Sequence, residues 1–468
     1  MLFNSLHFLF FLPIGVGLYY LISQKFRWIL IFIASCYFYM VFVPEYILIL
    51  FLIIIVDYIS AITIERVGGK LKLFYLIASL TANISLLGFF KYFNFLNENI
   101  VSLFSIFGKE LHPVNLNIIL PIGLSFHTFQ SMSYTIEVYR GNQKAEKHLG
   151  YFANYVLFFP QMVAGPIERY ATLGNELRNA HEPLYKNFSD GFKLVLFGLF
   201  VKMTIADNIA PFVNQIYSDP LKYKSYEVIL SVFLFSFQIY ADFFGYSTIA
   251  LGSAKLLGVN IMDNFKTPYL SKNVSEFWSR WHISLSTWFR DYLYIPLGGN
   301  RVKLPRWALN ILIVFMVSGL WHGANWTFVI WGALHGLMLL MEKYFSLKFK
   351  FKIKSGWSFI NILLVLKTFI ITSFIWVFFR AESFEKAKNI LKACFFNNNS
   401  GAEKVDFIIP IVFSLVIILF DVLFFNSRVD NKISTFKTVY RWTFYFVIIF
   451  CLLIFSGTQK FTFIYFQF

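Results

Sequence analysis

The chain has 468 residues, of which 58% are hydrophobic, 21% aromatic and only 14% charged, and its mean hydropathy is +0.63. These values exclude an ordinary soluble domain and indicate an integral membrane protein. The formal charge of +16 does not indicate a nucleic-acid partner, because the basic residues fall in short loops between apolar runs, as expected for membrane topology.

Apolar runs near the length of a membrane span recur along the whole chain. Each is expected to be helical, because a backbone inside a bilayer must satisfy its own hydrogen bonds. The first run is too long, too aromatic and too weakly basic at its start for a cleaved signal, so we interpret it as a retained helix. We predict about 11 spans, near residues 6–24, 28–43, 45–64, 73–91, 192–210, 227–257, 307–321, 324–342, 357–379, 406–425 and 441–457, with shorter apolar pieces near 116–134 and 149–165.

The loop charges predict the orientation. Lys25 and Arg27 follow the first span and a basic loop at 66–72 follows the third, whereas the intervening turn at 43–45 contains an acid and no base. The N-terminus is therefore expected outside. The same count gives these sides for the later segments: 343–354 inside, 380–405 outside, 427–441 inside and the final residues outside.

Ionisable residues inside apolar runs are costly unless they are paired or hydrated, so they are the first functional candidates. They are His127, Asp242, His282, His322 and His335. Asp242 is expected to pair with a base across the bundle or to stay protonated, and the structural pair is favoured. His335 is interpreted as a core or cytoplasmic-end residue. No metal site is expected, since no histidine lies in an HxH or HExxH pattern and the three cysteines form no CxxC pair.

Residues 274–301 (VSEFWSRWHISLSTWFRDYLYIPLGGNR) alternate aromatic with charged residues and are too polar to span a membrane. The pattern resembles an interfacial amphipathic helix. Its arginines suit anionic groups, which are either lipid phosphates or the phosphates of a diffusible donor. We assign Arg280, Arg290 and Arg301 to donor binding.

Residues 317–336 (VSGLWHGANWTFVIWGALHG) are interpreted as two helix ends that meet at a site. His322 lies at a glycine-flanked break, and irregular backbone at membrane depth is tolerated only around a protein-lined cavity. A functional imidazole and one that is bonded to a neighbouring helix carbonyl both fit this pattern.

Several long strings containing these residues resemble the membrane-bound O-acyltransferase (MBOAT) family, in particular its bacterial branch that acetylates alginate and peptidoglycan. The strings are LPIGLSFHTFQSMSY, FFPQMVAGPIER, DFFGYSTIALGSAKLLGVNI, EFWSRWHISLSTWFRDYLYIPLGGNR, SGLWHGANWTFVIWGALHG and FIYFQF. The resemblance implies an all-α polytopic bundle around a central funnel, in one membrane domain, 1–468. Within it, 1–115 would hold N-terminal spans, 116–343 the catalytic core and 344–468 C-terminal spans.

The resemblance also implies a function. A multi-pass protein of the bacterial inner membrane would take acetyl from a cytoplasmic donor, acetyl-CoA, with no bound cofactor. It would pass the acetyl group to an envelope polysaccharide, alginate-like or peptidoglycan, directly or through a periplasmic SGNH-type acetyltransferase partner. His322 matches the family's catalytic histidine and His282 its second histidine. His127 departs from the aromatic residue that is usual in its string, and we assign it to packing or chamber lining.

The residues suggest how such a transfer could proceed. Imidazole has an ordinary pKa of about 6.5, which suits a base for the acceptor hydroxyl, so His322 is the expected base. His282 or Asn325 would stabilise the oxyanion. The transfer is either direct or relayed through Tyr465 in the terminal string, for which an aromatic belt at the membrane interface is the alternative. A transporter or flippase without chemistry and a scaffold for a soluble acetyltransferase are the competing functions.

Overall fold

A computed structural model describes residues 1–117, 120–163, 165–349, 356, 358–396, 405–425, 427–456 and 463–464. Within these ranges the protein consists of helices and their connections, and no strand occurs in them. The predicted all-helical class is confirmed. The helices divide into two compact units, Met1–Phe192 with Ala250–Met262 and Lys193–Ile249 with Asp263–Phe468, and the single domain expected from the sequence stays a prediction.

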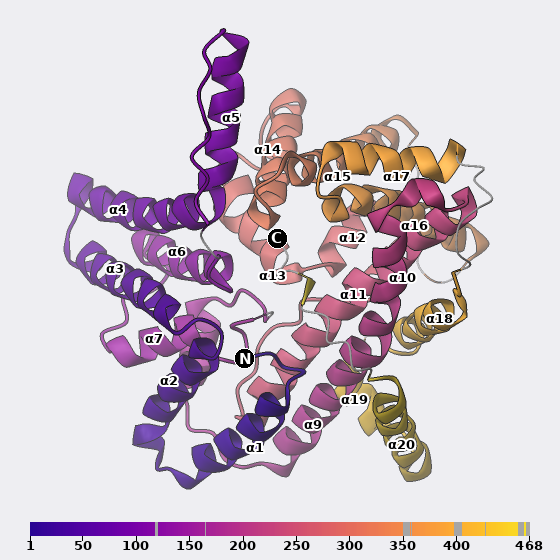
Figure 1. Cartoon of the computed structure of the whole chain (residues 1–468). Helices are drawn as coiled ribbons and strands as arrows, with labels where there is room; N and C mark the ends of the chain where they lie inside the picture. The colour runs from indigo at the N-terminus through magenta and orange to yellow at the C-terminus, as the bar shows by residue number, and fades with distance from the viewer. Residues whose placement is uncertain are drawn as a thin grey trace. The chain divides into compact units, whose positions relative to one another are not determined.

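The first unit contains the N-terminal helices (Figure 1). A π-helical turn at Gly88–Tyr92 joins α4 to α5, and the chain changes direction there, as Figure 1 shows. The helices are α1 (Leu6–Leu21), α2 (Gln24–Met40), α3 (Ile47–Arg66), α4 (Gly69–Leu87), α5 (Phe93–Ile106), α6 (Leu124–Arg140), α7 (Leu149–Leu157) and α8 (Asn175–Arg178).

Two helices, α9 (Tyr185–Leu199) and α11 (Ser225–Leu256), run from one unit into the other. A π-helical turn at Phe200–Ala206 continues α9 into α10. The helices of the second unit are α10 (Asp207–Ser218), α12 (Val274–Arg280), α13 (Ile283–Phe289), α14 (Leu304–His322), α15 (Trp326–Phe349), α16 (Phe359–Arg380), α17 (Phe384–Phe396), α18 (Ile408–Leu423), α19 (Val429–Ser434) and α20 (Thr438–Phe455).

Each expected span coincides with a helix or with part of one. Among the described residues, 7 continuous helical segments are long and apolar enough to cross a membrane, and α1 and α18 are shorter apolar helices. The crossing segments are Pro44–Arg66, Gly69–Ile106, Tyr185–Ser218, Ser225–Leu256, Leu304–His322, Phe359–Arg380 and Thr438–Phe455. The protein is therefore a multi-pass membrane protein, and the larger span count stays a prediction.

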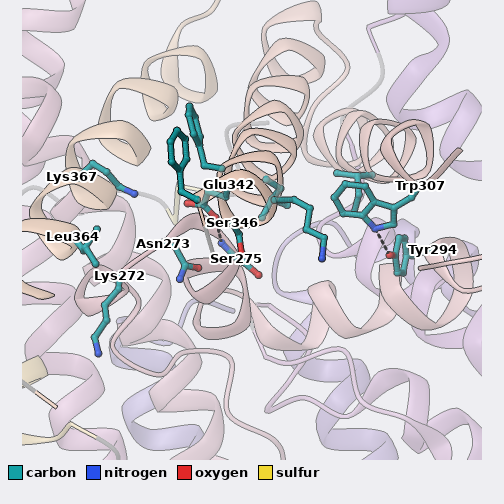
Figure 2. A pocket seen from close by; sticks show the side chains of 14 residues that line it. Lys272, Asn273, Ser275, Tyr294, Trp307, Glu342, Ser346, Leu364 and Lys367 are labelled. Carbon is teal, nitrogen blue, oxygen red and sulfur yellow. Dashed lines mark hydrogen bonds between the residues drawn. The ribbon is translucent and has the colours of Figure 1, made fainter. Parts of the chain in front are cut away.

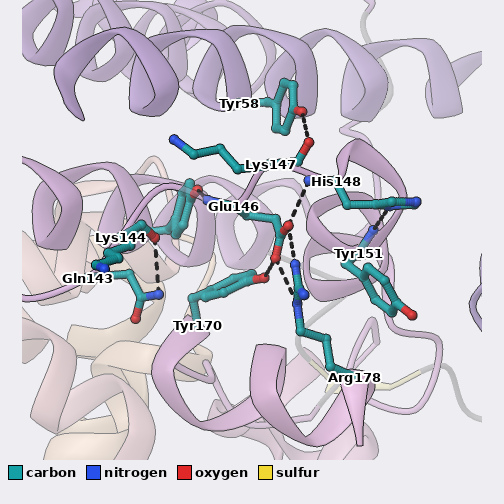
Figure 3. A network of polar contacts seen from close by, with 10 residues as sticks. Tyr58, Gln143, Lys144, Glu146, Lys147, His148, Tyr151, Tyr170 and Arg178 are labelled. Carbon is teal, nitrogen blue, oxygen red and sulfur yellow. Dashed lines mark hydrogen bonds and ion pairs between the residues drawn. The ribbon is translucent and has the colours of Figure 1, made fainter. Parts of the chain in front are cut away.

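A polar network fixes the loop between α6 and α7 in the first unit (Figure 3). The buried Glu146 carboxylate accepts hydrogen bonds from Tyr170, from the Arg178 guanidinium and, at 2.7 Å, from the backbone N–H of His148. Its own N–H donates to the Tyr134 hydroxyl at 2.7 Å. Burial raises the pKa of Glu146, but the hydrogen bonds outweigh burial and leave that pKa below its ordinary value.

His127 is buried in α6 of this same unit. Its Nδ1 lies 2.8 Å from the Val156 carbonyl oxygen, and its ring meets the Tyr39 ring edge-on. These contacts agree with the packing role expected for it.

Candidate active site

The break predicted in 317–336 is present. Helix α14 ends at His322 and α15 begins at Trp326. Glycine lets the two helices lie in direct contact, because a Cβ at Gly319 would overlap the Phe328 carbonyl and one at Gly332 would overlap the Phe315 carbonyl. Close packing at small residues is the usual way in which membrane helices associate. The helix pair therefore fixes where the terminal histidine of α14 lies.

His322 is 4% exposed and lies in a cage of aromatic rings. The centroid of its imidazole is 4.9 Å from that of Trp321, 5.2 Å from that of Trp331 and 5.4 Å from that of Phe379. These rings exclude bulk water and limit the imidazole to a few orientations. A general base must lie within reach of the proton that it takes, and the cage holds this imidazole in one place.

His282 lies beside His322, with their ring centroids 6.4 Å apart and the ring planes inclined by 49°. The residue is fully buried, and its ring also packs edge-on against the Phe243 ring, with the centroids 4.8 Å apart. The two histidines singled out from the sequence, 40 positions apart by their numbers, are thus brought together in one cluster.

The backbone at His282 is unusual. The segment 274–301 does not form the single amphipathic helix that its pattern suggested: α12 ends at Arg280, α13 starts at Ile283, and between them His282 adopts a left-handed conformation with φ of 42°. Such a φ is uncommon for a residue other than glycine. The break turns the imidazole inward toward the aromatic cluster instead of leaving it on a helix face.

Asn264 holds this break in place. Its backbone carbonyl accepts the Ile283 N–H at 3.0 Å, and its side-chain oxygen accepts the Ser284 hydroxyl at 2.6 Å. Its amide nitrogen donates to Ser247 of α11 at 3.2 Å. Sequence reasoning missed Asn264, and no signal in a single sequence separates it from other loop asparagines.

Asn325, proposed as an oxyanion donor, has local partners. Its amide nitrogen donates to the Glu382 carbonyl at 2.9 Å, and its oxygen accepts the Thr327 N–H at 3.0 Å, at the start of α15. The oxygen caps the start of α15, and the amide nitrogen joins that cap to the turn between α16 and α17, which favours a structural role. Its role in catalysis stays a prediction.

Asp242 forms the structural pair that the sequence favoured. Its carboxylate lies 2.5 Å from the Lys202 ammonium, which lies 2.6 Å from Asp207. Lys202 lies close to α11 because Gly198 and Gly245 let the two backbones come together. A Cβ added to either glycine would lie within 3 Å of the carbonyl oxygen of the other. Sequence reasoning missed Lys202. Like Asp242, it is an ionisable residue inside an apolar run, where an unpaired charge is costly, so the same argument could have found it.

Asp242 also binds the end of the described chain. Its carboxylate accepts the Ile464 N–H at 2.7 Å. Phe463 is fully buried and its ring lies 4.6 Å from Tyr246 and 5.6 Å from Phe243. Phe243 is the ring that contacts His282, so residues 463–464 are one aromatic ring away from the histidine pair. Tyr465, the proposed relay, lies outside the described residues.

The three arginines assigned to the donor differ from one another. Arg280 pairs with Glu276 at 2.9 Å and donates to the Lys266 carbonyl at 3.0 Å, so its guanidinium joins elements of the protein. Arg290 and Arg301 are exposed, and Arg290 lies 2.8 Å from the neighbouring Asp291. Arg290 and Arg301 are therefore accessible to a phosphate in solution.

His335 shares the Trp331 ring with the aromatic cage of His322. It is fully buried on α15, stacked at 3° on Phe277 and edge-on to Trp278 and Trp331. Among the described residues, neither ring nitrogen has a hydrogen-bond partner. These surroundings agree with the core role that was expected for it.

Comparison with known proteins identifies relatives of this chain. Residues 69–381 match the membrane-bound O-acyltransferase family. A protein of Azotobacter vinelandii named "probable alginate O-acetylase" is 37% identical over 84% of this chain and 78% of its own length. The "peptidoglycan O-acetyltransferase" of Helicobacter pylori is 35% identical over 84% of this chain and 79% of its own. The "teichoic acid D-alanyltransferase" of Bacillus subtilis is 28% identical over 58% of this chain and 71% of its own.

Proposed function

The chain belongs to the membrane-bound O-acyltransferase family, and from that premise we propose that it transfers acetyl from cytoplasmic acetyl-CoA toward an envelope polysaccharide. The resemblance found in the sequence is thereby confirmed at the level of the family, and the protein is a membrane acyltransferase. The proposed acceptor is alginate-like or peptidoglycan, as in the names of the relatives. The proposed setting is the bacterial inner membrane, with the N-terminus outside.

One observation carries the proposal, namely that His282 and His322 share a buried aromatic cluster with ring centroids 6.4 Å apart. At that separation two imidazoles can contact one acyl group from two sides. We assign His322 as the general base that takes the acceptor's hydroxyl proton, and His282 as the group that stabilises the oxyanion. Attack by the hydroxyl oxygen forms the new C–O bond and the oxyanion; its collapse breaks the C–S bond of the thioester, and the departing thiolate takes the proton from His322.

The C-terminal segment provides the first acceptor in this proposal. Ile464 is held by Asp242 beside the histidine cluster, and Tyr465 is the next residue in the sequence. Its phenol would receive acetyl from the donor. A hydroxyl of a periplasmic SGNH-type partner would then take the acetyl group, and the proton of that hydroxyl would return to the phenolate. The position of residues 463–464 supports this relay over an aromatic belt.

The experiment supplies purified full-length protein with acetyl-CoA that is radiolabelled in the acetyl group. Release of CoA and covalent labelling of the protein are expected for wild type, and Tyr465→Phe should abolish the labelling. His322→Ala should slow CoA release by roughly 10²- to 10⁴-fold, the usual contribution of a general base. His7→Ala, at an exposed histidine, serves as the control and should behave as wild type.

The outcomes separate the steps of the proposal. Near wild-type release by a folded His322→Ala protein would refute the base assignment. Labelling of Tyr465→Phe would refute the relay but keep the transferase. A wild-type protein that releases no CoA and transfers no acetyl with donor and acceptor both present would refute the choice of acetyl-CoA.

A further inference from the structure

A cavity of about 810 Å³ lies among α12, α14, α15 and α16 of the second unit (Figure 2). Its volume falls in the range of roughly 300–1,000 Å³ that is typical of small-molecule sites. Neither His282 nor His322 is among its lining residues. The cavity is therefore separate from the candidate active site and needs its own explanation.

The lining carries an excess of positive charge. Lys272, Lys343 and Lys367 line the cavity with a single carboxylate, Glu342. That carboxylate is already used within the protein: its two oxygens accept the N–H groups of Val274 at 2.7 Å and the following residue at 3.2 Å. Lys343 and Lys367 thus add positive charge to a lining whose one carboxylate already has partners, which favours an anionic ligand.

Lys367 is the lysine whose position most strongly favours an anionic ligand. It is exposed on α16, a helix whose apolar window has a mean hydropathy of 2.3. By sequence position Lys367 is eight residues past the start of the helix at Phe359, which is about 12 Å along its axis. A lysine so far into a spanning helix is costly unless its ammonium meets water or an anion. In Figure 2 it lies on the same side of the cavity as Lys272 and Leu364.

The rest of the lining is apolar and partly accessible. Phe345 and Phe349 on α15 are 49% and 63% exposed, although both line the cavity. The cavity thus combines cationic groups with aromatic surface that a hydrocarbon chain can cover. A free inorganic anion would bind the cationic groups but would leave the aromatic surface uncovered.

The position in the sequence agrees with a membrane-surface ligand. The lysine-rich segment 343–354 directly follows the apolar part of α15 and was predicted on the inner side. Lysine clusters next to a spanning helix and basic pockets between spanning helices on that side bind anionic lipid headgroups. Charge, aromatic surface and location therefore favour the same class of ligand.

We propose that this cavity binds an anionic membrane phospholipid, with its phosphate at the lysines and its acyl chains along Phe345 and Phe349. The bound lipid would join α12, which leads into His282, to α14, which ends at His322. It would thereby stabilise the relative placement of the two elements that carry the histidines. The proposal concerns binding and is independent of the acyl-transfer chemistry.

The test is a lipid titration of the purified full-length protein, stripped of lipid in neutral detergent and followed by native mass spectrometry. Phosphatidylglycerol and phosphatidylcholine with identical acyl chains are compared. We expect phosphatidylglycerol to bind more tightly. The double variant Lys343→Gln/Lys367→Gln should weaken that binding by about 25-fold, on the order of fivefold for each lysine near a lipid headgroup.

A matched control removes two charges elsewhere. Lys186→Gln/Lys437→Gln alters two exposed lysines outside the cavity and should bind phosphatidylglycerol as wild type does. Equal affinity for the two lipids, or an unchanged affinity in the cavity variant, would overturn the proposal. Displacement of phosphatidylglycerol by CoA or by inorganic phosphate would also overturn it, because the cavity would then serve a soluble phosphate.

Discussion

Removing the Asp242 carboxylate should free the C-terminal segment and destabilise the second unit. Lys202 and Asp242 have side chains only 1% and 4% exposed, and breaking a buried ion pair costs about 3–5 kcal/mol. Asp207 still pairs with Lys202 at 2.6 Å, so the lower end, about 3 kcal/mol, is expected for Asp242→Ala. The lost hydrogen bond from Ile464 to a charged acceptor adds about 1.5–3 kcal/mol of local destabilisation.

Two assays follow this change. Tryptophan fluorescence in detergent should show a lower unfolding midpoint, and trypsin should cleave faster after Lys460, three residues before Phe463. Asp242→Asn separates the two effects, since its amide oxygen still accepts the Ile464 N–H while the charge is lost. That variant should lower the midpoint with little change in cleavage.

The control for this experiment is Glu385→Ala, which removes an exposed carboxylate from α17 and should change neither readout. If Asp242→Ala keeps both the wild-type midpoint and the wild-type rate of cleavage after Lys460, the argument that Asp242 anchors the chain end is wrong.

Three further predictions concern other parts of the protein. Gly319→Val should force α14 away from α15, cost about 1–3 kcal/mol of stability and reduce acyl transfer, whereas Gly17→Ala, which meets open space, should be neutral or slightly stabilising by thermal unfolding. Arg290→Glu and Arg301→Glu should raise the apparent KM for the donor in steady-state assays, and an unchanged KM would refute their assignment. Because the pKa of Glu146 is lowered on folding, its stabilising contribution is complete above its ordinary pKa of about 4.3 and is lost as the pH falls through the lowered value. Glu146→Gln should therefore unfold at a lower temperature than wild type at pH 7, with the difference shrinking on acidification; a constant difference would contradict the linkage.

The sequence predicted those features that depend on local pattern and on the cost of burying charge. Apolar runs located the helices, and the glycines around His322 located the break between α14 and α15. The same cost argument predicted a base opposite Asp242 but could not name Lys202, because the partner depends on which helices cross.

The features that the sequence did not predict depend on tertiary contacts. The periodicity of residues 274–301 suggested one helix, whereas contacts with Asn264 hold a break at His282. The segment 463–464 meets Asp242 from more than two hundred positions away. The cavity gathers Lys272, Lys343 and Lys367 from three separate segments; the sequence marks Lys367 as costly in an apolar run but does not show which lysines lie near it.

The left-handed backbone of His282 has a consequence for how this protein can change. Glycine adopts a φ of 42° at little cost, whereas another residue there gives up of order 1 kcal/mol or more. A chain optimised for folding alone would place glycine between α12 and α13. At position 282, greater stability therefore favours glycine, whereas the proposed chemistry requires histidine. Substitutions that stabilise the turn between α12 and α13 are expected to inactivate the protein.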